Sequence, residues 1–364
     1  MIHLKEIDNF SEILKSNTPL LDVRAPIEYI EGSFPNAYNF PLMSDSERHQ
    51  IGIRYKEHGQ KSAISLGHEL VSGKTKAQRI DQWSKFVKKY PKGALYCFRG
   101  GLRSKISQEW IYEHSGVSYP RIKGGYKALR AFLIDEMQRI SSKVNFLVIG
   151  GQTGCGKTIL LNKFDNSLDL EGFANHRGSA FGNNVTPQPK QIDFENRLIT
   201  NLIKKESFNY LLIEDEGNNI GTIYVPEAIK EKARESKIVI LRALLEERIE
   251  ISLQAYVIDM TKHFIIRDPV NGFEQFSSYW LNSLSKIQKR LGGVRYQSLL
   301  KHLNLALNKY KNNSDSSGFL PLIESLLVDY YDPMYDFQIS NKKHRVIYEG
   351  NFEEVKNYLQ EFKS

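Results

Sequence analysis

The sequence has little cysteine and no long hydrophobic run. Only Cys97 and Cys155 occur among 364 residues, so a disulfide framework cannot hold the fold together. Apolar runs such as 146–149 are far shorter than the roughly 18–20 residues that span a bilayer. The first ten residues lack the apolar stretch of a signal peptide. These absences argue against the membrane and secreted classes, and we expect a cytoplasmic protein.

The chain also lacks a large excess of charge of either sign. It has 50 Lys and Arg against 42 Asp and Glu, a formal charge of +8, and residues 1–140 hold 22 basic and 15 acidic residues. A modest basic excess suits nucleic acid or another polyanion, but it is also common on solvated surfaces. Hydrophobic residues make up 41%, which is typical of a globular protein, and the length suggests two domains.

Short apolar strands alternate with helical patterns along the chain, which predicts an α/β fold with parallel sheets. Strands are expected at 19–24, 39–42, 94–96, 144–149, 210–213 and 238–241. The stretch 44–76 fits no single pattern, and the chain is largely helical from residue 244 onward. We predict a domain at 1–140, a second parallel-sheet domain at 141–311, and an extension at 312–364 that packs on the second domain.

A phosphate-binding loop occupies residues 151–158. The segment fits the pattern G-x-x-x-x-G-K-[ST], with an apolar strand before it and a helical pattern after it. Its glycines let backbone N–H groups converge on a phosphate, while the lysine supplies a cation and the threonine a Mg²⁺ ligand. The predicted binding residues are Gly151, Gly154, Gly156, Lys157 and Thr158. Among the acidic residues 214–216 we name Asp215 as the second Mg²⁺ ligand, although the sequence does not decide which carboxylate faces the metal.

A second loop begins at Cys97, where a predicted strand passes into a helix. Arg99, Gly100, Gly101 and Arg103 follow it, and such a loop can surround a tetrahedral anion while its arginines favour the thiolate. A buried core cysteine is the alternative. For Cys155, inside the phosphate loop, we expect a packing role.

Segments 21–29 and 31–37 resemble the opening of a rhodanese domain, and 124–128 resembles its closing Gly-Gly segment. The active loop of ordinary rhodaneses is Cys-x4-Arg, whereas Cys97 to Arg103 is Cys-x5-Arg. The longer loop resembles that of rhodanese-fold phosphatases and arsenate reductases. It makes simple thiosulfate sulfurtransfer less favoured and keeps phosphatase activity as a competitor.

The order of the motifs resembles one family over nearly the whole chain. The Cys97 loop, the phosphate loop, the segment 174–182 and the segment 330–335 together resemble the bacterial tRNA 2-selenouridine synthases. This resemblance implies a rhodanese-like domain fused to a P-loop NTPase-like domain. It also implies S-geranylation of the wobble 2-thiouridine of tRNA from geranyl diphosphate, followed by replacement of sulfur with selenium from selenophosphate.

The resemblance assigns roles that the residues alone leave open. Cys97 would form a selanylcysteine intermediate, or its thiolate would assist direct addition of selenophosphate. Arg99 and Arg103 would assist it, and Arg177 would join the phosphate loop in binding the diphosphate. No tightly bound cofactor is expected, and Mg²⁺ is a candidate ion at the phosphate loop. The partners are the tRNA anticodon stem-loop and the two co-substrates, with no membrane, and the protein is expected to be a monomer.

Several residues fit both a binding role and an ordinary structural one. The basic helical residues that would track tRNA phosphates are Lys286, Lys289, Arg290, Arg295 and Lys301; a solvated helix face is equally consistent. Two functions from other classes also remain: an ATP-dependent rhodanese-type sulfurtransferase acting on tRNA, and a non-catalytic selenium or sulfur carrier.

Overall fold

The computed structural model describes residues 4–362, and the chain forms two compact units. Unit 1 contains residues 1–140 and 190–206, and unit 2 contains 141–189 and 207–364. We predicted the segment 190–206 to be part of the domain 141–311, but it groups with unit 1. No helix among residues 4–362 is long and apolar enough to cross a membrane.

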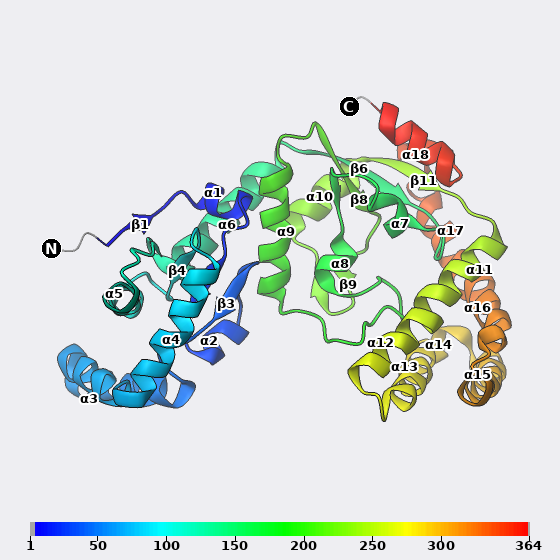
Figure 1. The fold of residues 1–364 in the computed structure, drawn as a ribbon. Helices are drawn as coiled ribbons and strands as arrows, with labels where there is room; N and C mark the ends of the chain where they lie inside the picture. Colours follow the sequence, from blue (N-terminus) through cyan, green and yellow to red (C-terminus); the bar gives the residue numbers. More distant parts are fainter. Residues whose placement is uncertain (1–3, 363–364) are drawn as a thin grey trace. The chain divides into compact units, whose positions relative to one another are not determined.

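Unit 1 is built on a parallel five-stranded sheet with the strand order β1-β5-β4-β2-β3. Figure 1 labels β1, β3 and β4 of this sheet. The strands are β1 (Glu6–Ile7), β2 (Leu20–Asp22), β3 (Ala37–Asn39), β4 (Ala94–Tyr96) and β5 (Arg121–Ile122). The strand expected at 39–42 forms earlier, since Pro41 lacks the N–H that a ladder needs. In a parallel sheet all carboxyl ends meet at one edge, so the chain after β2, β4 and β5 converges there.

Helices supply the rest of unit 1. They are α1 (Phe10–Lys15), α2 (Pro26–Ile30), α3 (Asp45–Leu70), α4 (Gly73–Lys89), α5 (Leu102–Ser115), α6 (Gly125–Ser141) and α9 (Gln191–Lys205). The stretch 44–76 thus forms α3 and the start of α4. Ser44 caps α3 with Glu47 in a capping box. Gly59, with φ of 75°, interrupts α3 and divides it into two helical halves.

Unit 2 contains a second parallel sheet, with the strand order β12-β11-β6-β8-β7. Its strands are β6 (Asn145–Gly150), β7 (Ser167–Leu168), β8 (Tyr210–Glu214), β11 (Lys237–Leu241) and β12 (Val346–Gly350). β6 lies between β8 and β11, so the phosphate loop leaves the middle of the sheet. β12 comes from the C-terminal segment, which therefore completes the sheet of unit 2.

Short helices and a small hairpin surround this sheet. These elements are α7 (Lys157–Leu161), α8 (Leu170–Ala174), α10 (Glu227–Glu235), α18 (Phe352–Glu361), and the antiparallel pair β9 (Asn219–Ile220) and β10 (Ile223–Tyr224). α18 packs on β11 and β12. Val355 and Leu359 of this helix are fully buried with Leu147 and Leu212 of the sheet.

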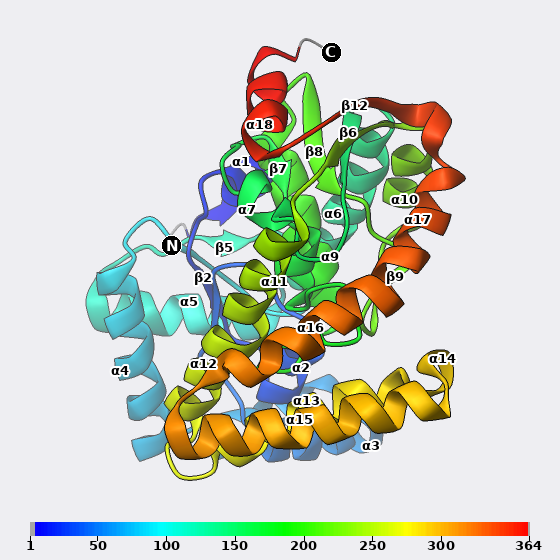
Figure 2. The same ribbon diagram turned by 90° about the vertical axis from the view of Figure 1, so that its right-hand side faces the viewer.

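The remaining part of unit 2 is helical, as the sequence predicts. Its helices are α11 (Leu245–Leu253), α12 (Asp259–Arg267), α13 (Gly272–Lys286), α14 (Gln288–Leu291), α15 (Gly293–Asn313), α16 (Leu320–Leu326) and α17 (Asp332–Ser340). Single-turn π-helices at Gln254–Ile258 and Leu327–Tyr331 join α11 to α12 and α16 to α17, and short 3₁₀ turns lie at Ser316–Phe319 and Lys343–Arg345. α13 and α15 pack side by side (Figure 2).

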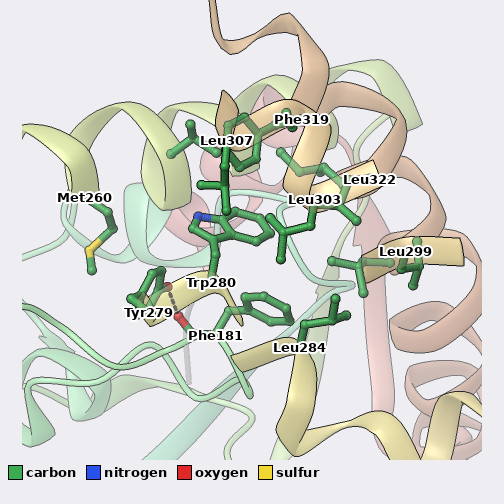
Figure 3. Packing of buried hydrophobic residues seen from close by; sticks show 14 of the residues in the cluster. Phe181, Met260, Tyr279, Trp280, Leu284, Leu299, Leu303, Leu307, Phe319 and Leu322 are labelled. Carbon is green, nitrogen blue, oxygen red and sulfur yellow. Dashed lines mark hydrogen bonds between the residues drawn. The ribbon is translucent and has the colours of Figure 1, made fainter. Parts of the chain in front are cut away.

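The core of the helical part is centred on Trp280, which is 2% exposed. Its ring lies 5.0 Å from that of Phe181 and 5.1 Å from that of Phe319, measured between centroids. Figure 3 shows Leu303 and Leu307 around the same indole. Because Phe181 belongs to the loop after α8, this core anchors that loop to the helices.

Candidate functional site

The phosphate loop of unit 2 has a backbone that only glycine can follow. Gly151, Gly154 and Gly156 have φ values of 153°, 81° and 92°. A Cβ on Gly151 would lie 2.5 Å from Cys155 Sγ, and one on Gly154 would lie 2.8 Å from the carbonyl oxygen of Arg248. Cys155 is buried beneath the loop in the core of the sheet. The loop therefore keeps its N–H groups at the carboxyl edge of β6, where an anion can approach.

Lys157 folds back over the loop. Its Nζ donates to the carbonyl oxygens of Gly151 at 2.8 Å and of Gln152 at 3.4 Å. Burial acts to lower the pKa of Lys157, but Coulombic attraction to the ionised forms of neighbouring groups, among them Glu171 and Glu216, outweighs burial, so the pKa of Lys157 is raised. The ammonium is thus held charged at the place where a phosphate would bind.

Three glutamates surround the lysine. Glu214, at the end of β8, accepts a hydrogen bond from Thr158 Oγ1 at 3.3 Å and another from the backbone N–H of Glu171 at 3.2 Å. Burial and mutual repulsion raise the pKa of Glu171 and Glu214 to about 8 and that of Glu216 to about 7. This carboxylate cluster (Glu171, Glu214 and Glu216) therefore holds protons near neutral pH and would lose them to a bound cation.

We predicted Asp215 as the Mg²⁺ ligand that accompanies Thr158, but in the structure its carboxylate pairs with Lys342. Both of its carboxylate oxygens accept hydrogen bonds from Lys342 Nζ, at 2.7 and 2.9 Å. Glu214 is the acidic neighbour of Thr158 instead. The two neighbouring carboxylates thus reach different partners, although Asp215 also lines the cavity above the loop.

A hydroxyl and a carboxylate side by side suit Mg²⁺, which prefers oxygen ligands and usually completes its shell with phosphate oxygens and water. Thr158 and Glu214 are such a pair. Among residues 4–362, no group of three His, Cys, Asp or Glu side chains is arranged to hold a metal ion by itself. The arrangement fits a cation that arrives with a phosphate ligand.

Arg248 is a residue that no sequence motif indicated. Its Nε donates to the carbonyl oxygen of Thr153 at 2.9 Å, and Nη1 donates to Gln152 Oε1 at 3.1 Å. The same guanidinium pairs with both oxygens of Asp332, at 3.0 and 2.5 Å. The arginine is only 3% exposed. It therefore fastens the phosphate loop to α11 and α17 at once.

Arg177 and His176 lie in the loop after α8. Arg177 Nη1 donates to the carbonyl oxygen of Ala255 at 2.5 Å, and its guanidinium lies 5.3 Å from the centroid of the Tyr256 ring. His176 is buried, which lowers its pKa. Arg177 thus borders the phosphate-loop cavity with its charge partly directed to backbone, and the buried His176 lines the same cavity.

A cavity of about 1330 Å³ opens above the phosphate loop within unit 2. Its lining includes Lys157, Thr158, Arg177, Asp215, Lys286 and Arg290, together with aromatic and aliphatic side chains such as Tyr256, Tyr331, Met334 and Ile251. Two residues of the predicted basic stretch, Lys286 and Arg290, therefore face this cavity. Lys289, Arg295 and Lys301 are exposed, and Arg295 contacts Asp329.

Cys97 of unit 1 lies directly after β4, at the edge where the carboxyl ends of the strands meet. It is 2% exposed, and its Sγ donates to Ser104 Oγ at 3.3 Å. The backbone after it is held by the closing Gly-Gly segment, since Tyr126 N–H donates to the carbonyl oxygen of Cys97 at 2.9 Å. A Cβ on Gly125, whose φ is 60°, would lie 2.2 Å from that oxygen.

Arg103 is near Cys97 but is paired with Glu28 of α2. The two form a bidentate pair at 2.5 and 3.0 Å. Burial alone would lower the pKa of Arg103, but Glu28 and the Cys97 sulfur outweigh it and raise it. Arg99 is exposed. Arg99 is thus the freer of the two predicted arginines to meet an incoming anion.

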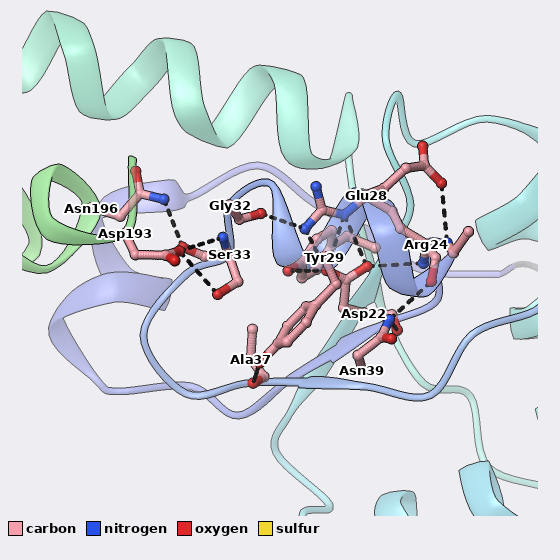
Figure 4. A network of polar contacts seen from close by, with 12 residues as sticks. Asp22, Arg24, Glu28, Tyr29, Gly32, Ser33, Ala37, Asn39, Asp193 and Asn196 are labelled. Carbon is pink, nitrogen blue, oxygen red and sulfur yellow. Dashed lines mark hydrogen bonds and ion pairs between the residues drawn. The ribbon is translucent and has the colours of Figure 1, made fainter. Parts of the chain in front are cut away.

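A buried polar network supports the same edge of the sheet (Figure 4). The Arg24 guanidinium pairs with Asp22, its Nη2 lying 2.6 Å from Oδ2, and also donates to the carbonyl oxygen of Gly32 at 2.8 Å. Tyr96 donates to the same Asp22 oxygen at 2.7 Å. Asp193 and Asn196 of α9 bond Ser33. The network explains why α9 belongs to unit 1.

Comparisons with known proteins bear on both units. The family model described as "tRNA 2-selenouridine synthase AAA domain" matches residues 144–364. Proteins named tRNA 2-selenouridine synthase are similar over nearly the whole chain. The one from Marinobacter nauticus is 47% identical over 98% of this chain and 97% of its own. The one from Sulfurovum sp. is 45% identical over 100% of both chains, and the one from Pseudomonas aeruginosa (strain LESB58) is 47% identical over 97% and 96%.

Among solved structures, the N-terminal domain of a protein named as ATP/GTP binding from Clostridium difficile 630 aligns with 32% of this chain and 89% of its own. It is 30% identical with a TM-score of 0.29, a value too low to indicate a shared fold.

Proposed function

The chain belongs to the tRNA 2-selenouridine synthase family and is an enzyme, and from this premise we propose that its two units divide a two-step modification of tRNA between them. Unit 2 transfers a geranyl group from geranyl diphosphate to the sulfur of the wobble 2-thiouridine. Unit 1, which we take to be rhodanese-like, then replaces the alkylated sulfur with selenium from selenophosphate.

The phosphate loop supports the first step. The C–O bond of an allylic diphosphate breaks when the departing diphosphate is neutralised, and the loop offers converging N–H groups with the charged Lys157 above them. A Mg²⁺ ion held by Thr158 and Glu214 would supply further charge neutralisation. The cavity of about 1330 Å³ has room for the diphosphate, its apolar chain and a nucleoside. Lys286 and Arg290 on its wall suit the tRNA backbone.

The Cys97 loop supports the second step. Its sulfur lies at the carboxyl edge of a parallel sheet and at the start of α5, where helix N–H groups favour an anion. In the route through selanylcysteine, the thiolate attacks selenium, an S–Se bond forms, and the Se–P electron pair leaves on phosphorus. The bound selenium then adds to C2 while geranyl thiolate leaves, and a thiol cleaves the S–Se bond, forming a disulfide with Cys97 and releasing selenouridine. In the direct route, selenium adds to C2, geranyl thiolate leaves, and water cleaves the Se–P bond.

The observation that carries the proposal is that unit 2 has a glycine-rich loop with Lys157 at a large cavity, while unit 1 has a thiol, Cys97, at a cavity of its own. Nucleoside mass spectrometry of 2-thiouridine tRNA incubated with the enzyme, geranyl diphosphate and selenophosphate tests it. Finding neither the geranylated nor the selenated nucleoside would refute the two-step assignment.

Two variants separate the steps. We expect Cys97→Ser to abolish selenation and spare geranylation, with Cys155→Ser as the matched control. We expect Lys157→Ala to lose geranylation, with Lys163→Ala, an exposed lysine just after α7, as its control. Intact-protein mass spectrometry after incubation with selenophosphate alone distinguishes the routes, since only the first adds selenium to Cys97. Geranylation unchanged in Lys157→Ala would remove the phosphate loop from the mechanism.

A further inference from the structure

Unit 1 contains a cavity of about 1000 Å³ that opens onto the Cys97 loop. This volume is at the upper end of the range for small-molecule sites, which is roughly 300–1,000 Å³. A phosphate, a selenophosphate or a persulfide fills only a small part of it. The cavity is therefore much larger than the anion chemistry of Cys97 requires.

The walls of this cavity are mainly hydrophobic. They come from the loop before α3, from both halves of α3, and from α5. The apolar lining residues are Leu42, Met43, Ile51, Ala63, Ile64, Val71, Leu102, Ile106 and Trp110. Exposed apolar surface of this extent is costly in water, and its burial by an apolar ligand is correspondingly favourable.

Charged lining residues gather near the thiol: Arg99 and Arg103 belong to the Cys97 loop, Arg24 follows the neighbouring strand β2, and Glu28 pairs with both Arg103 and Arg48. Glu31, Gln60 and His68 also line the cavity. The cavity thus has a charged end at the thiol, while its wall along α3 and α5 is mixed but mainly apolar. A ligand that fits it has an anionic or polar reacting end and a hydrocarbon chain.

We propose that this cavity, the prenyl chamber, binds the hydrocarbon chain of the thiol that leaves during selenation. The inference rests on the proposed function, in which the second step starts from S-geranyl-2-thiouridine. It adds that unit 1 recognises the geranyl chain itself and not only the nucleoside and selenophosphate.

Covalent connection places the chain in the chamber. As the C2–Se bond forms, the C2–S bond breaks and its electron pair leaves on sulfur as geranyl thiolate, which takes a proton from water. The first carbon of the chain is bonded to that sulfur, so the chain begins within one bond of the leaving atom. With C2 beside Cys97, the ten-carbon chain has to lie in the space next to the loop, and the chamber is that space.

Binding of the hydrocarbon chain affects selenation by favouring the nucleoside that carries the geranyl group over nucleosides that lack it. Burying hydrocarbon away from water is favourable, so the chamber gives the geranylated nucleoside an advantage over unmodified 2-thiouridine. Selenation would thereby be restricted to tRNA that has completed the first step. A small S-alkyl group would leave the chamber empty and react poorly.

A binding experiment tests the chamber apart from catalysis. Isothermal titration of the full-length enzyme with geranyl methyl sulfide uses a probe that has no diphosphate for the phosphate loop. We expect Ile64→Trp, which fills the chamber, to weaken binding at least tenfold. Ile53 lies on the same helix, is 43% exposed and does not line the chamber. The Ile53→Trp variant should therefore bind geranyl methyl sulfide as tightly as wild type does. Equal binding by wild type and Ile64→Trp would overturn the proposal.

A substitution at a second lining position distinguishes lost binding from misfolding of the Ile64→Trp variant. Ile51 is half-buried and lines the chamber, so Ile51→Trp should weaken binding of the same probe with an unchanged circular dichroism spectrum. Wild-type affinity in a folded Ile51→Trp enzyme would count against the chamber.

A chain-length series links the chamber to the reaction. Anticodon stem-loops carrying S-methyl, S-dimethylallyl or S-geranyl 2-thiouridine are incubated with selenophosphate, and selenation is followed as kcat/KM. We expect at least a tenfold rise from dimethylallyl to geranyl in wild type and in Ile53→Trp, and loss of that rise in Ile64→Trp. Equal rates along the series would overturn the proposal. Absence of selenation with all three substrates, beside intact binding of geranyl methyl sulfide, would instead refute the proposed function and leave the chamber standing.

Discussion

The carboxylate cluster beside Lys157 makes the stability of unit 2 depend on pH, and Glu171→Gln is the change that tests this. Burial and the charge of Glu216 raise the pKa of Glu171 to about 8. A carboxyl whose pKa is raised by folding contributes stability that is fully present below its unfolded value, near 4.5. That contribution is lost as the pH rises through the folded value, because ionisation then favours the unfolded chain.

The magnitude follows from the same linkage. Each unit of pKa shift corresponds to about 1.4 kcal/mol, so ionising a carboxyl raised from 4.5 to about 8 costs up to about 5 kcal/mol above pH 8. A glutamine at this position keeps the shape and stays neutral, and it also removes repulsion from Glu214 and Glu216. We expect Glu171→Gln to stabilise unit 2 on the order of 2–5 kcal/mol at pH 8 and to have little effect at pH 5.

Hydrogen exchange of the β8 amides, corrected for the intrinsic pH dependence of exchange, measures this in unit 2 without interference from unit 1. Wild-type protection should fall between pH 5 and pH 8, while protection in Glu171→Gln should fall less. Glu250→Gln, an exposed glutamate of α11, is the control and should follow wild type. A flat wild-type profile, or an identical decline in Glu171→Gln, would refute the assignment of a strained carboxylate cluster.

Two further substitutions probe how each loop is held. Arg248→Met leaves Asp332 and the phosphate loop without their shared partner. We expect Arg248→Met to destabilise unit 2 by about 3–5 kcal/mol in urea unfolding and to weaken geranyl diphosphate binding. The control Arg242→Met, at the exposed pair with Glu349, should change the stability by less than about 1 kcal/mol. Equal effects of the two substitutions would contradict the anchoring role of Arg248. Gly125→Ala places a Cβ 2.2 Å from the Cys97 carbonyl oxygen at a φ of 60°. It should cost about 1–3 kcal/mol and reduce selenation while geranylation continues, and a wild-type rate for both steps would show that the loop tolerates the displacement.

Contiguous motifs were readable from the sequence because their chemistry depends on local backbone geometry. The phosphate loop is such a case, since three glycines with positive φ and the following lysine act within eight residues. The helical end of unit 2 and the strands β4, β6, β8 and β11 were also predictable, because their apolar patterns are strong. The stretch 44–76 was not, because α3 is largely exposed and interrupted at Gly59, so it carries little hydrophobic periodicity.

Contacts between residues far apart in the chain were decided only by the tertiary structure. The sequence left open which of the acidic residues 214–216 faces the metal, and we named Asp215; in the tertiary structure Thr158 donates to Glu214, while Asp215 pairs with Lys342. Likewise, Arg103 could be placed in its loop, but its pairing with Glu28 depends on two strand ends that meet at one sheet edge.

The two cysteines of the chain show the same division between what the local sequence determines and what the tertiary structure decides. The sequence by itself determined that one follows a strand and precedes a glycine-rich turn, and that the other lies inside a phosphate loop. Only the packing of α3 and α5 decided that Cys97 borders a large apolar cavity, because a cavity is a property of how distant elements meet and leaves no local pattern in the chain.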